Sequence, residues 1–180
     1  MKVLVTAFKP FNKSPNNYSI EVLKYIENVD KMILDVIYDE SYNELNRTNN
    51  LNEYDLIIAL GEARSRNDLM LEVKAVNLSD CKITDNQGTI KTNEVIDGNI
   101  SDSLNTKVNI KLVEEEILFS NDAGKFVCNN LYFHLLSNYP EKSLFIHIPE
   151  CNNDITLYKK YALKIKKIIN LLLGGNNENQ

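Results

Sequence analysis

The chain has 180 residues, a length that favours one compact α/β domain over two. Apolar residues make up 43% of the chain and charged residues 25%, which suits a packed core with an ordinary solvated surface. The net charge is −5 and basic residues gather only around Lys164–Lys167, so nucleic acid is excluded as an expected partner.

The sequence also argues against a membrane or disulfide-rich protein. No apolar stretch approaches the roughly 20 residues of a membrane span, and Val3–Phe8 is too short for a signal-peptide core. The three cysteines, Cys81, Cys128 and Cys151, are odd in number and lack the close pairs of a zinc site. We therefore expect a soluble, cytoplasmic protein with no membrane partner, in a compartment where a thiol stays free.

Short apolar runs alternate with segments of helical spacing along the chain. The first strand is predicted at Lys2–Phe8, before a loop rich in Pro and Asn that reaches Asn17. Ser19 is predicted to cap a helix that runs to about Asn28. The other predicted strands are Met32–Tyr38, Tyr54–Leu60, Met70–Asn77, Val108–Leu112, Ile117–Phe119 and Leu144–Pro149. The other predicted helices are Ser41–Leu51, Asn129–Asn138 and Leu157–Leu173.

Strands interleaved with helices predict a three-layer α/β/α sandwich around a largely parallel, mixed sheet. We expect a single domain over residues 1–173 and a disordered tail over residues 174–180. Asp85–Gly88 is predicted to form a turn, whereas the polar stretch Thr92–Asn105 predicts no element. Because ligands gather beyond the carboxyl ends of parallel strands, the loops after Phe8 and after Gly61 are candidate site loops.

Three side chains offer the parts of a nucleophilic site. Cys128 follows a glycine-containing turn at a helix start, where the helix dipole favours a thiolate. His147 lies near a strand end, whereas His134 lies about 600° around the helix from Cys128, at about 100° per residue, and faces another side. Glu72 is a candidate for the carboxylate that orients a catalytic histidine. A small buried cysteine, a core histidine and a solvent-facing glutamate are the ordinary alternatives, and the residues alone leave them open.

Five segments carry a family resemblance when they are considered together. Ser120–Asn129 is similar to Ser-x-x-Ala-Gly-x-Phe-Val-Cys-Asn, and Phe145–Pro149 matches Phe-Ile-His-Ile-Pro. The other three segments are Val3–Phe11, Glu72–Asn77 and Asp80–Gly88. In this order, over most of the chain, they resemble the pyrrolidone-carboxylate (pyroglutamyl) peptidase family.

The resemblance implies a cysteine peptidase that removes an N-terminal pyroglutamyl residue from small peptides. It implies Cys128 as nucleophile, His147 as base and Glu72 as the orienting carboxylate. It also implies an α/β/α sandwich, no metal, no cofactor, and a homotetramer or homodimer.

By the same resemblance, Phe8 and Phe11 line an apolar slot for the flat lactam ring, and Asn17 contacts the substrate. Ordinary core packing is the alternative for the two phenylalanines, and it is stronger for Phe8. Lys82 stands where the family has an arginine directed at the site. Lys82 is expected to support the oxyanion. It keeps the positive charge of that arginine but lacks the planar guanidinium group.

The chain departs from the family pattern in several loops. Ala7 and Asn12–Lys13 replace glycines of the first loop, and Ser65 replaces the second glycine of the loop after Gly61. The stretch Asp97–Lys107 is shortened. Two further interpretations therefore stay open: a catalytically weak or silent relative that binds a small cyclic amide or a peptide N-terminus, and an enzyme of the same fold with another acyl substrate.

Overall fold

The computed structural model describes residues 1–174. The strands are β1 (Val3–Phe8), β2 (Asp30–Leu34), β3 (Leu56–Glu62), β4 (Met70–Glu72), β5 (Lys74–Val76), β6 (Ser79–Cys81), β7 (Lys91–Glu94), β8 (Ser103–Asn105), β9 (Leu118–Ser120) and β10 (Ser143–Ile148). The helices are α1 (Tyr18–Leu23), α2 (Glu40–Thr48), α3 (Val127–Asn138) and α4 (Ile155–Gly174), with short 3₁₀ helices η1 (Leu51–Glu53) and η2 (Ile110–Val113).

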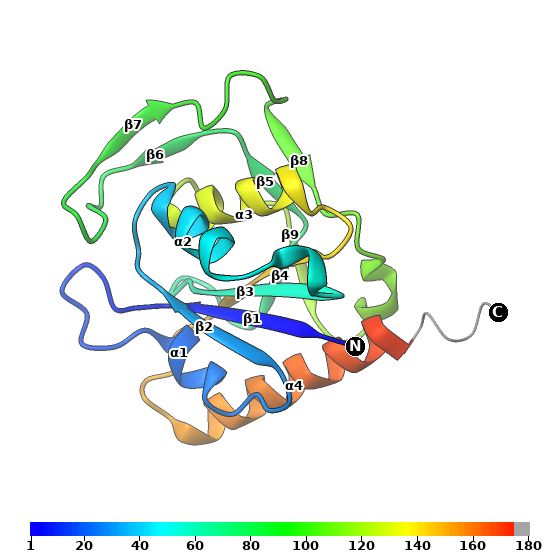
Figure 1. Cartoon of the computed structure of the whole chain (residues 1–180). Helices are drawn as coiled ribbons and strands as arrows, with labels where there is room; N and C mark the ends of the chain where they lie inside the picture. Colours follow the sequence, from blue (N-terminus) through cyan, green and yellow to red (C-terminus); the bar gives the residue numbers. More distant parts are fainter. Residues whose placement is uncertain (175–180) are drawn as a thin grey trace.

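Six strands form the central sheet in the order β2-β1-β3-β10-β4-β9 (Figure 1). The first four are parallel, β4 is antiparallel to β10, and β9 is parallel to β4. Every residue of β1 and β10 is buried, as expected of central parallel strands covered on both faces. The predicted largely parallel, mixed sheet is confirmed.

Helices cover both faces of this sheet (Figure 1). α1 and α4 pack on one face, and α2 and α3 pack on the other. Alternation along β1 sends Val3, Val5 and Ala7 into the first core and Leu4 and Phe8 into the second. The result is the three-layer arrangement that the sequence predicted.

The start of α1 differs from the prediction. Asn17, not Ser19, is the N-cap residue, and its Oδ1 accepts a hydrogen bond from Ser19 N at 3.0 Å. The Ser19 hydroxyl is used elsewhere, because it accepts a hydrogen bond from Phe8 N at 3.1 Å. The helix ends at Leu23, and Asn28 has a left-handed φ of 61°, so the helix does not extend as far as predicted.

Two predicted strands take other forms. Val108–Leu112 is not a strand but contains the start of η2, where Ile110 N bonds to Val108 O at 2.8 Å. Met70–Asn77 is divided at Val73, so that β4 joins the central sheet and β5 pairs with β8 in a separate ribbon. The stretch Thr92–Asn105, for which no element was predicted, contains β8 and most of β7.

A second ribbon, β6 and β7, forms an arm that extends over the side of the sheet that carries α2 and α3 (Figure 1). The predicted turn at Asp85–Gly88 lies in the connection between its strands, with Gly88 N bonded to Asp85 O at 3.0 Å. Of the predicted tail, Gly174 ends α4, and residues 175–180 lie outside the described part of the chain.

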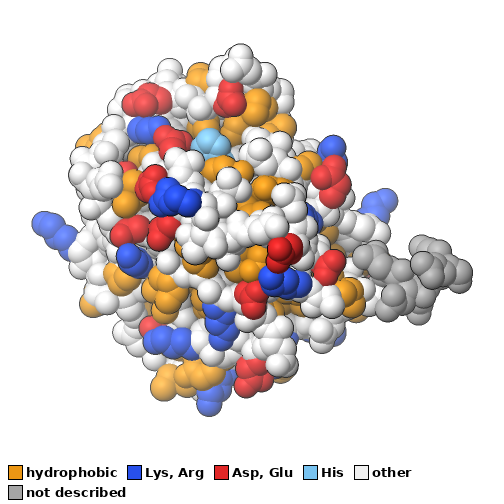
Figure 2. Space-filling model, in the orientation of Figure 1, with side chains coloured by type: hydrophobic (Ala, Val, Ile, Leu, Met, Phe, Trp, Pro, Cys, Tyr) orange, Lys and Arg blue, Asp and Glu red, His pale blue; other side chains and the backbone are white. Residues whose placement is uncertain are grey.

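The described surface carries charges of both signs. On the face shown in Figure 2, Lys and Arg side chains alternate with Asp and Glu side chains instead of gathering into one basic patch. Within residues 1–174, no helix combines the length and the apolar character needed to cross a bilayer.

Candidate active site

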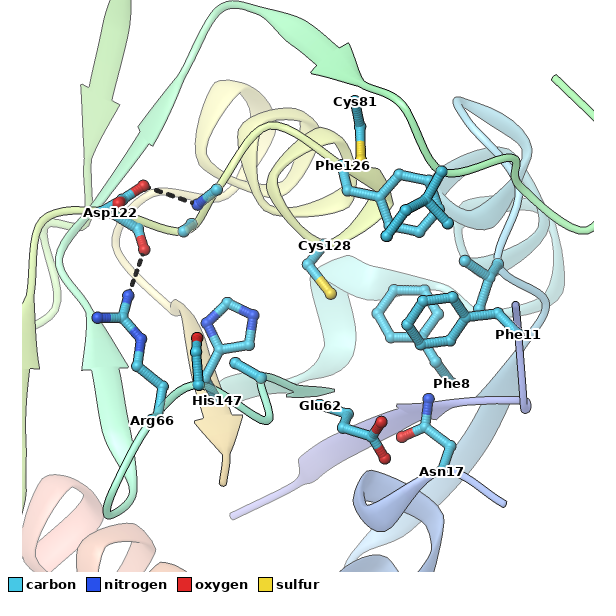
Figure 3. A pocket seen from close by; sticks show the side chains of 16 residues that line it. Phe8, Phe11, Asn17, Glu62, Arg66, Cys81, Asp122, Phe126, Cys128 and His147 are labelled. Atoms are coloured by element: carbon cyan, nitrogen blue, oxygen red, sulfur yellow. Dashed lines mark hydrogen bonds between the residues drawn. The ribbon is translucent and has the colours of Figure 1, made fainter. Parts of the chain in front are cut away.

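A cavity of about 370 Å³ opens where β1, β3 and β10 reach their carboxyl ends. Its walls also include the β9–α3 loop, the first turn of α3, and Cys81 and Ile83 from the arm (Figure 3). Cys128 and His147 both line it. This position is the one expected for a ligand site in an α/β sheet.

Cys128 is the second residue of α3, as the sequence predicted. The turn before it is held by Asp122, whose Oδ1 accepts a hydrogen bond from Gly124 N at 3.0 Å, and Gly124 has a φ of +77° that favours glycine. The first bond across the helix start joins Asn130 N to Phe126 O. The N–H groups of Cys128 and Asn129 lie before this first bond and so have no partner within the helix.

The surroundings of Cys128 favour the neutral thiol in the resting site. Burial, together with the negative charges of Glu72 and Glu62, raises the pKa of Cys128 to about 12. The backbone N–H of Cys128 acts in the opposite direction but does not offset the loss of water. The helix start therefore favours the thiolate, as expected, but burial and the two nearby carboxylates favour the neutral thiol more strongly.

Gly61 brings β3 against the thiol. It pairs with His147 across the β3–β10 ladder. A Cβ atom on Gly61 would lie 2.8 Å from Cys128 Sγ and 2.7 Å from Phe145 Cζ, closer than side-chain carbon atoms approach other atoms. Only glycine leaves room for the sulfur at this point of the strand.

His147 is oriented by Glu72. Its Nδ1 lies 2.7 Å from Glu72 Oε1, with His147 4% exposed and Glu72 fully buried. The contact follows from the antiparallel register, because Glu72 faces Phe145 and is the diagonal neighbour of His147. An ionised carboxylate only accepts hydrogen bonds, so Nδ1 carries the proton and Nε2 is left as the basic nitrogen.

The thiol and the imidazole face the same space (Figure 3). Within residues 1–174, no hydrogen bond joins Cys128 to His147. A nucleophile and its base are often further apart before substrate binds than in the reacting complex. The structure thus brings Cys128, His147 and Glu72 into one constellation, with Glu72 behind the histidine.

The aromatic residues expected at the substrate slot line the other end of the cavity (Figure 3). Phe8 is 1% exposed and also belongs to the core, whereas Phe11 is partly exposed in the loop after β1. Phe126, which sequence reasoning missed, packs against Phe11 with ring centroids 5.7 Å apart. Its place within a family motif, two residues before Cys128, was the available signal.

Asn17 lines the cavity with part of its hydrogen-bonding capacity already used. Its Oδ1 accepts from Ser19 N and from Ser19 Oγ, at 3.0 and 2.7 Å. Its Nδ2 donates to Lys9 O at 3.2 Å, which leaves one N–H. Asn17 can therefore serve a ligand as a donor but not as an acceptor.

Glu62 and Arg66 are charged residues of the cavity that were not predicted as site residues. Glu62, at the end of β3, lies beside Asn17 (Figure 3) and accepts hydrogen bonds from Tyr18 N at 2.8 Å and from Arg64 Nε at 2.7 Å. Arg66 contacts Glu72 Oε1 at 3.3 Å. Both belong to the loop after Gly61 that the sequence marked as a site loop, but spacing alone does not show which of its side chains turn inward.

Lys82 is the predicted site residue that the structure does not bring to the cavity. It is exposed, whereas its neighbours Cys81 and Ile83 line the cavity. The chain bends at Lys82 and Ile83 after β6 has ended, and Lys82 lies outside the cavity lining. The cation at the cavity is Arg66 instead. Within residues 1–174, no group of three or more His, Cys, Asp or Glu side chains is placed to hold a metal ion.

His134 lies elsewhere, as predicted. Its Nε2 is 3.1 Å from Asp39 Oδ1, and its ring stacks on Tyr42 with centroids 5.1 Å apart. This contact pairs α3 with α2 on the outer side of the second core. His147 is therefore the histidine of the cavity.

The comparisons with known proteins agree over nearly the whole chain. The family model described as pyroglutamyl peptidase matches residues 1–172. A pyrrolidone-carboxylate peptidase of Brachyspira hyodysenteriae is 32% identical over 173 residues, 86% of either chain. One from Thermosipho melanesiensis is 31% identical over the same share.

Solved structures give the same result. The pyroglutamyl peptidase I of Bacillus amyloliquefaciens is similar with a TM-score of 0.82 and 27% identity, over 94% of both chains. A mutant pyrrolidone carboxyl peptidase from Pyrococcus furiosus is similar with a TM-score of 0.83 and 25% identity, over 97% of this chain and 99% of that one. The chain therefore belongs to the pyroglutamyl peptidase family, and with it to the peptidases.

Proposed function

We propose that this protein is a cysteine peptidase that removes an N-terminal pyroglutamyl residue from peptides. The observation that carries the proposal is the buried contact of 2.7 Å between His147 Nδ1 and Glu72 Oε1, with the imidazole and Cys128 on the wall of one cavity. A nucleophile, a base and an orienting group in this relation are the requirements of acyl transfer. Membership of the pyroglutamyl peptidase family supports pyroglutamyl as the acyl group.

The cavity suits a small, flat, uncharged ring. Phe8 and Phe11 offer aromatic surface for the ring faces. The free N–H of Asn17 can donate to the lactam carbonyl, and the carboxylate of Glu62 can accept from the lactam N–H. These two contacts would satisfy both polar groups of the ring, which would otherwise be buried without partners.

In the acylation step, His147 Nε2 takes the proton from Cys128 Sγ as the sulfur attacks the pyroglutamyl carbonyl carbon. The transfer accompanies attack, because the resting thiol is neutral. The carbonyl oxygen gains the negative charge and is stabilised by backbone N–H groups at the start of α3. His147 then protonates the departing nitrogen, the C–N bond breaks, and a thioester to Cys128 remains.

In the deacylation step, His147 takes a proton from a water molecule as that water attacks the thioester carbonyl. The C–S bond breaks, the proton returns to sulfur, and pyroglutamate leaves. Glu72 keeps Nδ1 protonated throughout and stabilises the imidazolium after each proton transfer. The reaction needs Cys128 as a reduced thiol, so a reducing cytoplasm is the compartment that we propose.

The test is release of chromophore from a pyroglutamyl p-nitroanilide by the wild-type protein. We expect hydrolysis by the wild type, none by Cys128→Ala, and much slower hydrolysis of the prolyl p-nitroanilide, which lacks the ring carbonyl. Binding of a pyroglutamyl amide without hydrolysis would replace this proposal with the silent relative. Hydrolysis of another acyl anilide in preference would identify a different substrate.

A further inference from the structure

Arg66 joins three parts of the site through one nitrogen. Its Nη2 lies 3.3 Å from Glu72 Oε1, 3.1 Å from Ser120 Oγ and 2.6 Å from the carbonyl oxygen of Asp122. The side chain is 26% exposed and lines the cavity from the loop between β3 and β4 (Figure 3). The mechanism proposed above uses Glu72 but assigns no role to Arg66.

The first consequence concerns charge. Glu72 is fully buried, and within residues 1–174 its Oε2 has no hydrogen-bond partner. A buried carboxylate stays ionised only if a cation or several donors compensate for the lost water. A neutral His147 supplies one hydrogen bond but no charge. Arg66 is the cation in contact with Glu72 in the described part of the chain, so it is the counter-charge of the resting site.

The second consequence concerns position. Ser120 ends β9 and faces Glu72 across the β4–β9 ladder, and Asp122 begins the turn that leads to Cys128. Asp122 N also donates to Ser120 Oγ at 3.1 Å. By contacting Ser120 and Asp122 together with Glu72, Arg66 fixes the loop before the nucleophile relative to the carboxylate behind the base. The backbone of Glu72 is held separately, since Tyr132 Oη donates to its carbonyl oxygen at 2.8 Å.

Other ionisable groups around Glu72 come from several elements. His147 reaches it from β10 and Tyr132 from α3, and its charge acts on Cys128 of α3, whereas Glu62 and Asp122 line the neighbouring cavity from the end of β3 and from the β9–α3 loop. Apart from the histidine, each of these groups is neutral or negative at pH 7. Loss of the Arg66 charge would therefore leave the pair of Glu72 and His147 with a stronger hold on an extra proton.

We infer that Arg66 is a positioning residue of this site, which keeps Glu72 ionised and ties it to the loop that presents Cys128. This inference rests on the proposed function for its kinetic consequence, but not for its effect on His147. The active base is neutral His147. If the pair of Glu72 and His147 binds an extra proton more tightly, the base is inactive up to a higher pH.

The test compares Arg66→Met, Arg66→Lys and the control Arg47→Met, which removes an exposed arginine of α2. For Arg66→Met we expect a fall in kcat of about 10²-fold, the cost of displacing a catalytic group by about 1 Å, with little change in KM. The acid limb of kcat/KM should move to higher pH by about one unit. Arg66→Lys should have a reduced kcat, but its acid limb of kcat/KM should lie at the same pH as that of the wild type. Arg47→Met should match the wild type in both.

A second readout needs no substrate. The chain has two histidines, so ¹⁵N-histidine NMR follows the protonation of His147 directly, with His134 as internal reference. Arg66→Met should protonate His147 at higher pH than the wild type does, while His134 stays unchanged. An unchanged His147 titration in a folded Arg66→Met variant would overturn the inference. If instead the titration moves as expected but the wild type cleaves no pyroglutamyl amide, the inference stands and the proposed function fails.

Discussion

Glu72 and His147 show how burial gives one side-chain pair its chemical role. The carboxylate has no contact with water, and its Oε1 is shared between His147 and Arg66. A glutamate turned to solvent would leave the histidine ring free to rotate and free to change tautomer. In this site the ring is fixed with Nε2 toward the cavity, which is the nitrogen that the proposed reaction uses.

Glu72→Gln tests that role. Glutamine keeps the shape and can still accept from Nδ1, but it lacks the charge that stabilises the imidazolium. We expect a loss in kcat of several orders of magnitude, about 10⁴ as in the analogous change of a serine protease. The protein should remain folded, as judged by circular dichroism and thermal melting. A folded Glu72→Gln variant with wild-type kcat would show that the carboxylate is only structural.

Phe8 and Phe11 line the same slot but should respond differently to truncation. Phe11 lies in a loop, so Phe11→Ala should weaken kcat/KM for pyroglutamyl anilide by about 1–3 kcal/mol and leave the melting temperature unchanged. Phe8 is fully buried in the second core, so Phe8→Ala should cost about 3–5 kcal/mol of unfolding free energy. Urea denaturation and steady-state kinetics on both variants separate the two effects. Equal kinetics for Phe11→Ala and wild type would remove Phe11 from the slot.

At the scale of elements, β3 and β10 meet at the site through the pairing of Gly61 with His147. Gly61→Ala would place a methyl group 2.8 Å from Cys128 Sγ. Overpacking of this kind costs about 1–3 kcal/mol of stability, and the displaced sulfur should also reduce kcat strongly. The control is Gly98→Ala, because a Cβ at Gly98 meets no atom within 4 Å. Normal turnover by Gly61→Ala would mean that the thiol can shift without loss of function.

The central elements were predictable because their residue types, apolar patterns and flanking turns all favour the same structure. β1, β3 and β10 are apolar runs that are buried on both faces, and a helix start close to Cys128 followed from a glycine turn before an apolar periodic segment. Edge elements were less predictable. Val108 and Ile110 pack against the first core at the start of η2 instead of pairing as a strand, and Leu112 is exposed. The capping role expected of Ser19 belongs to Asn17.

The site was predictable where single residues carry the chemistry and not where contacts cross distant segments. Cys128, His147 and Glu72 stood out by residue type and by family motif. Arg66 keeps the arginine of the family's loop after Gly61 but was not predicted as a site residue, because its contacts join the loop after β3 to the end of β9 and the turn before α3. Lys82 was expected at the site from its motif alone, and the direction of its side chain depends on the path of the arm.

At the scale of the whole molecule, several cysteine and tyrosine side chains have raised pKa values in the folded state. Burial raises the pKa of Cys128 to about 12, of Cys151 to about 11, and of Tyr42 and Tyr158 to about 12. In the unfolded chain, cysteine ionises near pH 8.5 and tyrosine near pH 10. Above pH 8.5 the unfolded state therefore holds fewer protons than the folded state, and stability falls as pH rises.

We expect the urea midpoint to be flat between pH 7 and about pH 8.5 and to decline steadily toward pH 11. Cys128→Ala should decline less steeply, because one of the raised groups is gone. A wild-type midpoint that stays constant up to pH 11 would contradict the raised pKa values of these groups. The oligomeric state, a homotetramer or homodimer by resemblance, stays a prediction that light scattering of the purified protein can check.

The most direct test of the account is labelling with pyroglutamyl chloromethyl ketone, which combines the proposed acyl group with a carbon that a positioned thiol alkylates. Mass spectrometry of the wild type should find one adduct per chain, on Cys128. A pyroglutamyl peptide should protect Cys128, prolyl chloromethyl ketone should react far more slowly, and Cys128→Ala should remain unlabelled. Labelling of Cys81 or Cys151 in place of Cys128, or equal labelling by the prolyl reagent, would contradict the account.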